Sequence, residues 1–297
     1  MGDKKRLLIT VNPDLVAGKR VSTIRSVVSA LDPICDLLIV PISEYNFRDS
    51  TVSAYKRLKG GIFSPIGEIK PECDLWIVYS DGYWLDHTRY GFSSRMDFIR
   101  AQFKFHQDAL DSFVVAKVIN TPQAEKNCLK SWLAEIDAEK FGTIPTFKVR
   151  TFGDVKELLQ NRGTLVAKPD WGGAGGGIFK ISNKDDISKL ESLLHQESIS
   201  HNLLNDYSFQ LYATGEEKRL WFVGGECVSG RKTYGRHTPW SPDTKEFKVI
   251  YYGDRSVRGF SDDVMLARTL CHKAGFLVGS IDFIGNQINE INGAGTT

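Results

Sequence analysis

The sequence predicts an α/β protein built from more than one packed part. In residues 1–118, short apolar runs alternate with segments of helical periodicity, as in α/β layers on a mostly parallel sheet. In the remaining residues, a glycine-rich loop separates two short predicted strands, and the last two predicted strands carry acidic residues. At 297 residues the chain is long enough to form two or three packed subdomains with a sizeable core.

The first 118 residues contain most of the expected parallel sheet. Helical spacing of apolar residues from Val21 to Leu31 predicts a helix that Pro33 ends, and Met96 to Leu110 predicts another amphipathic helix. Residues 43–73 are rich in glycine and proline, and we predict a long loop or a substrate-side excursion there. The predicted buried strands are Arg6–Val11, Cys35–Pro41, Asp74–Tyr79 and Phe113–Ile119.

The second part is predicted to alternate strands and helices over its whole length. Thr121-Pro122 opens a helix from Pro122 to about Glu135, and further helices are predicted at Asp154–Gln160, Asp185–His195 and Ser261–Ala274. The predicted strands are Phe147–Arg150, Thr164–Ala167, Ile178–Ile181, Phe209–Tyr212, Arg219–Val223, Cys227–Gly230, Phe247–Tyr252, Leu277–Ile284 and a last strand ending at Asn292.

Composition and charge exclude several classes of protein. The chain is 41% hydrophobic and 25% charged, as ordinary globular proteins are, and its net charge of +2 with mixed signs does not predict nucleic-acid binding. The apolar run after Lys4 to Arg6 is broken by Asn12 and Pro13, so we predict a strand there and neither a signal peptide nor a membrane helix. Five scattered cysteines without a CxxC pair favour a cytoplasmic protein without a zinc site. A homo-oligomer is compatible with these features.

A glycine-rich loop follows one of the predicted strands. Five of the seven residues from Trp171 to Gly177 are glycine, which disfavours regular structure and exposes backbone N–H groups that can hold phosphate oxygens. The loop is not a Walker A motif, because no GK[ST] follows, and it is not GxGxxG, because Ile178 stands at the sixth position counted from Gly173. With Lys168 just before it, the loop is predicted to be a flap over a nucleotide; a mobile surface hairpin with a solvated lysine is the alternative.

Three oxygen donors interrupt the last two predicted strands. A three-residue connection around Gly285 and Asn286 would place Asp282 opposite Glu290, and Asn292 would share the face of Glu290 because side chains alternate along a strand. Facing carboxylates repel each other, and Mg²⁺ prefers oxygen ligands of this kind. We therefore predict a Mg²⁺ site here; a register that points the acids to solvent is the alternative.

In their order and spacing, these features resemble the ATP-grasp superfamily, within it the branch of glutathione synthetase and the ribosomal-protein glutamyl ligases. The resemblance covers residues 118–297 and implies an N-terminal pre-ATP-grasp α/β domain over 1–118 and an ATP-grasp domain over 119–297, with a lid subdomain at about 143–212. The segments that carry it are Val118–Gln123, Val166–Pro169 with the glycine loop, Phe209–Tyr212, Glu217–Arg219, Asp282 and Glu290–Asn292.

The resemblance also implies roles for individual residues. Lys168 and Lys130 are expected to contact the ATP phosphates, with Lys126 as the alternative to Lys130. Arg219 is expected to face the transferring phosphoryl group, and either Arg231 or Arg236 is a second catalytic arginine. The ATP-binding residues are then Lys130, Lys168, Gly172, Gly173, Gly175, Gly176, Gln210, Leu211, Tyr212 and Glu217, in which Gln210 to Tyr212 meet the adenine edge and Glu217, or its neighbour Glu216, meets the ribose. The metal ligands are Asp282, Glu290 and Asn292.

The function that this resemblance implies is ATP-dependent ligation of a carboxylate to an amine through an acyl phosphate, with ATP and one or two Mg²⁺ ions. The substrates would be small molecules or peptides. Two features depart from the family: the chain ends five residues after Asn292, before the family's C-terminal helix, and residues 235–258 differ from its substrate loop. The alternatives are a small-molecule kinase on the same fold and a nucleotide-binding regulatory protein without turnover.

Overall fold

The structure, a computed structural model, divides the chain into two compact units. The first comprises Met1–Glu125 with Gly293–Thr297, and the second comprises Lys126–Asn292. Most of the helix predicted between Val21 and Leu31 lies outside the described residues. None of the helices within the described ranges is long and apolar enough to cross a membrane. The structure describes residues 4–11, 28, 30–58, 63–78, 87–112, 114–170, 177–197, 203–234, 248–252 and 260–293.

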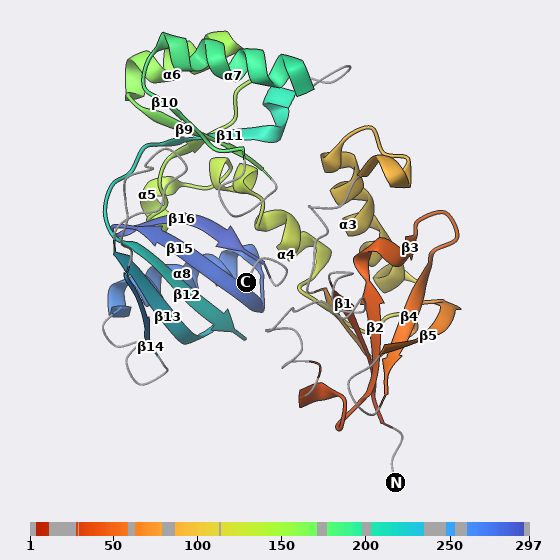
Figure 1. The fold of residues 1–297 in the computed structure, drawn as a ribbon. Coiled ribbons are helices and arrows are strands. Elements are labelled where there is room, and N and C mark those ends of the chain that lie inside the picture. Colours follow the sequence, from red (N-terminus) through yellow and green to blue (C-terminus); the bar gives the residue numbers. More distant parts are fainter. Residues whose placement is uncertain are drawn as a thin grey trace. The chain divides into compact units, whose positions relative to one another are not determined.

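The first unit is built on a sheet with the strand order β3-β4-β2-β1-β6-β7, and β5 pairs with β4. Figure 1 labels β1 to β5 of this sheet. β1 (Arg6–Val11) lies between β2 (Asp36–Pro41) and β6 (Leu75–Val78), and these three strands are parallel, as predicted. α3 (Arg95–Asp111) begins after Ser94, whose side chain accepts a hydrogen bond from the N–H of Asp97. The other elements are η1 (Ile42–Glu44), β3 (Tyr45–Asn46), β4 (Thr51–Arg57), β5 (Phe63–Ile69), η2 (His87–Tyr90) and β7 (Val118–Ile119).

Two predictions for this unit are wrong. Residues 43–73 are not a loop but contain the antiparallel strands β3, β4 and β5. Gly67 has a positive φ of 111° and lies next to an irregularity in the pairing of β4 with β5. Both strands continue past this irregularity, so Gly67 does not end a strand. The strand predicted over Phe113–Ile119 shrinks to β7, and Val115 forms only an isolated bridge with Cys73.

The sheet of the first unit separates two apolar clusters. Leu7, Ile9 and Val11 point to one of them and Leu8 to the other, because successive side chains of a strand face opposite sides. A buried chain of hydrogen bonds crosses the second cluster. Trp76 Nε1 donates to Thr10 Oγ1 (2.9 Å), Thr10 Oγ1 lies 2.6 Å from Tyr45 Oη, and Tyr45 Oη lies 2.9 Å from His106 Nε2.

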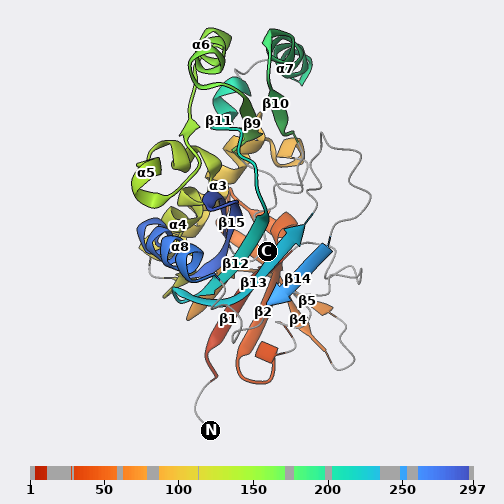
Figure 2. The ribbon, with the colours of Figure 1, turned by 90° about the vertical axis from the view of Figure 1, so that its left-hand side faces the viewer.

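The first part of the second unit is a four-stranded antiparallel sheet covered by two helices. The strand order is β10-β9-β11-β8, and α6 and α7 lie together on one side of the sheet (Figures 1 and 2). α6 starts with a reciprocal cap between Thr151 and Asp154. Of the strand predicted over Phe147–Arg150, only Phe147 belongs to a strand. The elements are β8 (Thr146–Phe147), α6 (Phe152–Arg162), β9 (Leu165–Pro169), β10 (Phe179–Ile181), α7 (Lys184–Glu197), η4 (Leu203–Asp206) and β11 (Tyr207–Leu211).

The helix predicted from Pro122 to Glu135 is broken. It consists of α4 (Pro122–Asn127) and η3 (Lys130–Ala134), because Leu129 between them is extended, with φ −65° and ψ 143°. The short helix α5 (Ala138–Phe141) follows. The break matters for the site, because Lys130 becomes the first residue of a short helix instead of a position inside a long one.

The second part of this unit is an antiparallel five-stranded sheet with the order β14-β13-β12-β15-β16. α8 (Ser261–Ala274) packs on one face of this sheet (Figure 2). On that face Lys218 Nζ donates to Asp263 Oδ2 at 2.6 Å. Arg219, the next residue of the strand, therefore faces the opposite side of the sheet. The strands are β12 (Glu217–Val223), β13 (Glu226–Tyr234), β14 (Lys248–Tyr252), β15 (Val278–Ile284) and β16 (Gln287–Asn292).

Candidate functional site

The hairpin of β15 and β16 places Asp282 opposite Glu290, as the spacing predicts, but by a different route. The connection has two residues and not three, because Ile284 pairs with Gln287. Gly285 has φ 60°, the positive value that glycine adopts at the first position of some tight hairpin turns. A two-residue turn alone would pair Asp282 with Asn289. A bulge at Asn289 shifts the register by one residue and restores the pair of acids.

Asp282 is held by an arginine from the neighbouring strand. Arg219 lies directly across from Asp282, and its Nε and Nη2 donate to the two carboxylate oxygens at 2.5 Å each. Only 4% of the Asp282 side chain is exposed. Asn292 Nδ2 also donates to Asp282 Oδ2, at 3.3 Å, so three of the predicted residues share one face of the sheet. The contact of Arg219 with a phosphoryl group stays a prediction.

Glu290 lies near two lysines. Lys130 Nζ is 3.7 Å from Glu290 Oε2, so the structure brings Lys130, and not Lys126, to this carboxylate within an ion-pair distance. Burial acts to raise the pKa of Glu290, but the positive charges of Lys130 and Lys168 outweigh it and lower that pKa to about 2. Burial raises the pKa of Asp282 to about 6, even with Arg219 beside it. The pKa values of the two facing acids thus shift in opposite directions.

Lys168 joins the hairpin to the four-stranded sheet. The residue is 7% exposed, and its ammonium donates to Gln210 Oε1 at 2.6 Å and to Asn289 Oδ1 at 2.7 Å. Gln210 Nε2 in turn donates to the backbone oxygen of Asn289 at 3.0 Å and to Thr146 Oγ1 at 3.2 Å. Lys168 and Gln210 thus both contact the segment that carries Glu290.

The other predicted residues are spread over neighbouring strands or lie outside the description. The N–H groups of Leu211 and Tyr212 donate to the backbone oxygens of Pro145 and Thr164, at 3.0 and 2.9 Å. Glu217 begins β12, and Arg231 lies across from Arg219 on β13. The predicted residues outside the described ranges are Gly172, Gly173, Gly175, Gly176 and Arg236.

Sequence reasoning missed two polar residues of this region. Asn289 reaches Lys168 because of the bulge, and no sequence pattern predicts that bulge. Asp170, 5% exposed, comes two residues after Lys168 and accepts hydrogen bonds from Lys148 Nζ (2.8 Å) and from Ser208 Oγ. An acid directly before the glycine loop is the only signal that could have directed attention to Asp170.

The donor set fits a divalent cation that arrives with a polyanion. Two carboxylates and the Asn292 amide are hard oxygen ligands of the kind Mg²⁺ takes, and no described group of three His, Cys, Asp or Glu residues offers a competing site. Arg219, Lys130 and Lys168 place three positive charges beside the two carboxylates, and the negative charge of Glu217 also acts on Arg219. Ser280 adds a fully buried hydroxyl that has no hydrogen-bond partner among the described residues, two positions before Asp282 on β15.

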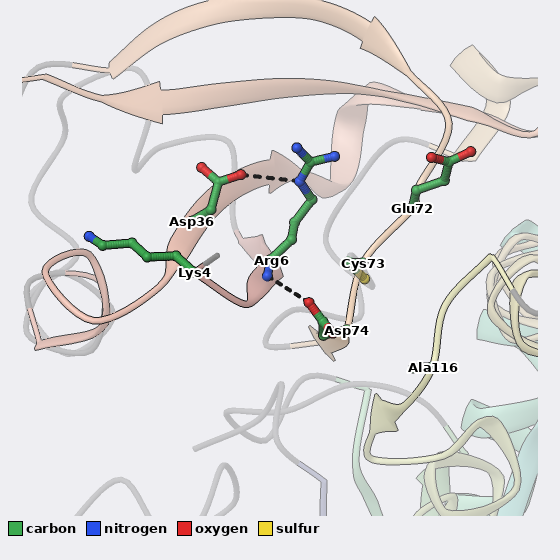
Figure 3. Close-up of a pocket in the computed structure, with 7 residues that line it drawn as sticks. All are labelled: Lys4, Arg6, Asp36, Glu72, Cys73, Asp74 and Ala116. Atoms are coloured by element: carbon green, nitrogen blue, oxygen red, sulfur yellow. Dashed lines mark hydrogen bonds and ion pairs between the residues drawn. The ribbon is translucent and has the colours of Figure 1, made fainter. Parts of the chain in front are cut away.

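A pocket in the first unit has a different character. It has a volume of about 330 Å³ and lies at the amino ends of β1 and β2 and just before β6, where Arg6 donates to Asp36 and its backbone N–H donates to Asp74 (Figure 3). Ligands of open α/β sheets bind at the carboxyl ends of the strands. Burial raises the pKa of the Cys73 thiol in this pocket to about 11, so the thiol is a poor nucleophile at neutral pH. We therefore assign no site to this pocket.

Comparisons with known proteins agree with the fold. No profile of a known protein family matches the chain. A glutathione synthetase of Neisseria meningitidis serogroup A is 29% identical over 184 residues, which cover 60% of this chain and 55% of that protein. The chain thus spans about half the length of this relative.

Solved structures match over nearly the whole chain. The ATP-grasp ligase PsnB, in complex with a minimal precursor, is 14% identical with a TM-score of 0.57, over 99% of this chain and 91% of PsnB. The D-alanyl-alanine synthetase A of Vibrio cholerae is 11% identical with a TM-score of 0.57, over 99% of this chain and 90% of the synthetase. The predicted α/β architecture is thereby confirmed: the protein has the ATP-grasp ligase fold and is distantly similar in sequence to bacterial glutathione synthetases.

Proposed function

We propose that this protein is an ATP-dependent carboxylate–amine ligase that uses Mg-ATP and forms an amide or peptide bond. The observation that carries the proposal is the facing pair of the buried Asp282 and the partly buried Glu290, with Arg219, Lys130 and Lys168 beside them in the second unit. Carboxylates for a metal ion and cations for a polyphosphate, gathered in one place, are what phosphoryl transfer requires.

The nucleotide would lie between the four-stranded and the five-stranded sheets of the second unit. Lys168 and Lys130 neutralise phosphate oxygens, and the glycine loop that follows Lys168 supplies backbone N–H groups. Gln210 to Tyr212 contact the adenine, and Glu217 contacts the ribose. In this assignment the four-stranded sheet with α6 and α7 forms the lid, at about 143–212, of an ATP-grasp domain that spans 119–297.

Asp282, Glu290 and Asn292 are the residues that would hold Mg²⁺. When bound, the ion supplies charge neutralisation on the β- and γ-phosphate oxygens. Metal and nucleotide arrive together in this proposal, because Mg-ATP is an anion and the positive charges of Arg219, Lys130 and Lys168 attract anions. Structures of PsnB have been solved with Mg and ADP, which supports the assignment.

The reaction has two steps. A carboxylate oxygen of the first substrate attacks the γ-phosphorus, the bond from that phosphorus to the β–γ bridging oxygen breaks, and ADP leaves. Arg219 and the two lysines stabilise the charge on the transferring group. An amine nitrogen of the second substrate then attacks the acyl carbon, loses a proton and expels inorganic phosphate, with Arg231 or Arg236 beside the acyl oxygen.

The substrates belong to two broad classes, small molecules and peptides. PsnB is a ligase solved with a precursor peptide, and the Vibrio cholerae protein is a D-alanyl-alanine synthetase. We therefore propose an amino acid or a peptide as the carboxylate donor and a second amine-bearing molecule of the same classes as the acceptor.

Hydroxylamine trapping tests the proposal. The protein is incubated with Mg-ATP, pooled amino acids and dipeptides, and hydroxylamine in place of the natural amine. A ligase produces a hydroxamate and ADP in equal amounts, and a Glu290→Gln variant produces neither. A stable phosphoester would instead assign a kinase, and ATP binding without either product would assign a nucleotide-binding protein without turnover.

A further inference from the structure

Asn289 and Glu290 are adjacent in the chain, yet both contact the same group of cations. Asn289 Oδ1 accepts a hydrogen bond from Lys168, and Glu290 Oε2 lies 3.7 Å from Lys130 Nζ. Neighbouring residues of a regular strand face opposite sides. The bulge at Asn289 removes this alternation, because two residues of β16 stand against Asp282 alone. The hairpin therefore gains an additional polar side chain at the site.

The orientation of each polar group around Lys168 follows from its neighbours. Thr146 Oγ1 donates to the backbone oxygen of Ile144 at 2.9 Å, so it accepts the hydrogen bond from Gln210 Nε2. Because the NH₂ group of Gln210 donates to Thr146 and to the backbone oxygen of Asn289, the Gln210 Oε1 faces Lys168. An ammonium has three N–H donors and no acceptor, so the oxygen of the Asn289 side chain must be the atom that faces it.

The contacts place the Lys168 ammonium between two neutral acceptors. Hydrogen bonds with a charged partner are about twice as strong as neutral ones, so the two amide oxygens restrict the long lysine side chain. Gln210 belongs to β11 and Asn289 to β16. The lysine position is thus defined jointly by the four-stranded sheet and by the strand that carries Glu290.

We propose that Asn289 is a positioning residue that holds the Lys168 ammonium where it meets the phosphates of the nucleotide. This inference rests on the proposed function, because it assumes that Lys168 contacts ATP. Asn289 does not touch the nucleotide; it acts through Lys168. Loss of the Asn289 side chain removes one of the two hydrogen bonds that restrict the Lys168 ammonium, so the lysine is less well ordered before the nucleotide binds and the affinity falls.

A double-mutant cycle on nucleotide affinity tests this inference. The dissociation constant of Mg-ATP is measured by calorimetry for the wild type, Asn289→Ala, Lys168→Met and the double variant. We expect Asn289→Ala to weaken Mg-ATP binding about 10-fold, as for loss of one hydrogen bond to a charged group. In the Lys168→Met background the same substitution is expected to change the affinity for Mg-ATP less than about 2-fold, because the effects of substituting two residues of one hydrogen-bond network do not add.

Two controls separate positioning from general damage. Asn286→Ala, at an exposed position in the turn of the same hairpin, should leave the affinity for Mg-ATP unchanged. Adenosine has no phosphates, so its affinity should be the same in Asn289→Ala and in the wild type. If Asn289→Ala does not fold, Asn289→Ser replaces it, because serine is too short to reach Lys168.

The outcomes distinguish this inference from the proposed function. An equal loss from Asn289→Ala in the wild-type and the Lys168→Met backgrounds overturns the role of Asn289, as does unchanged Mg-ATP affinity, while hydroxamate formation by the wild type still supports the ligase. A wild-type protein that does not bind Mg-ATP overturns both proposals.

Discussion

Arg219 and Asp282 face each other on adjacent antiparallel strands, and the guanidinium donates two parallel hydrogen bonds to the carboxylate. The Arg219 side chain is 19% exposed and that of Asp282 is 4% exposed, so the pair is largely removed from water. Two-fold hydrogen bonding of this kind fixes both side chains in direction as well as in distance. The pair makes the β12–β15 contact a structural requirement of the site.

Removal of Arg219 is expected to destabilise the protein strongly. Arg219→Ala removes both hydrogen bonds from the guanidinium to the buried Asp282 carboxyl group, and we expect a loss of about 3 kcal/mol or more in the free energy of unfolding, measured by urea denaturation without nucleotide. The double variant Arg219→Ala, Asp282→Ala should lose less, because no buried charge remains.

Arg268→Ala is the matched control. Arg268 forms an ion pair of 2.6 Å with Glu226, but these side chains are 51% and 73% exposed, and solvent screens the interaction. We expect a loss below about 1 kcal/mol. Equal losses for Arg219→Ala and Arg268→Ala would contradict the importance of the buried pair.

Magnesium is expected to stabilise this protein only together with the nucleotide. Asp282 and Glu290 already have Arg219, Lys130 and Lys168 beside them, and these positive charges disfavour a free cation. Mg-ATP at ~100 times its dissociation constant should raise the free energy of unfolding by about 2.7 kcal/mol. Mg²⁺ alone should raise it by much less, and Glu290→Gln should abolish the magnesium-dependent part of the ATP effect. Thermal unfolding of the full chain with each addition measures these differences, and stabilisation by Mg²⁺ alone to the same degree would refute the prediction.

Acid should weaken the first unit through His106. Burial lowers the pKa of His106 to about 3, whereas an unfolded histidine has a pKa near ~6.5. Between these values the unfolded chain binds a proton that the folded chain does not. The stabilising contribution is therefore complete above pH ~6.5 and is lost as the pH falls, by about 1.4 kcal/mol per unit. Between pH 7.5 and pH 5.0, the free energy of unfolding of the wild type, measured by urea denaturation, should fall by about 2 kcal/mol more than that of His106→Gln.

His272→Gln is the control for this pH dependence. His272 is exposed on α8, so its surroundings change little on unfolding. The acid-dependent loss should be the same in His272→Gln as in the wild type. If His106→Gln retained the full acid dependence, the assignment to His106 would be wrong.

Gly215 is expected to tolerate no side chain. It has φ 139°, and a Cβ atom would lie 2.7 Å from both the Cα and the N of Gly285 at the hairpin turn. Gly215→Ala must push this backbone away, and we expect a loss of about 2 kcal/mol together with weaker Mg-ATP binding, since Asp282 and Glu290 lie on the displaced strands. Gly91→Ala is the matched control: its φ of 78° is also positive, but nothing lies within 4 Å of the added atom, so only the backbone strain of about 1 kcal/mol applies. Equal losses in urea denaturation would contradict the close approach.

The local elements were predictable where periodicity and end signals agree. The strands at Arg6–Val11 and Leu75–Val78 and the helix at Ser261–Ala274 form where their patterns place them. The prediction of a loop over residues 43–73 was wrong, because glycine and proline occur at bulges and in edge strands as well as in loops. The break at Leu129 within the predicted helix has no helix-breaking residue that would announce it.

Asp282, Glu290 and Asn292 show what the sequence by itself determined: their spacing and the alternation of strand side chains were enough to place three oxygen donors on one hairpin. Only the tertiary structure decided how that register arises, through a two-residue turn and a bulge, and that Asn289 and Gln210 hold Lys168 beside it. The reason is physical. Alternation is a property of a single strand, whereas a bulge and a contact between residues 121 positions apart depend on how separate strands pack together.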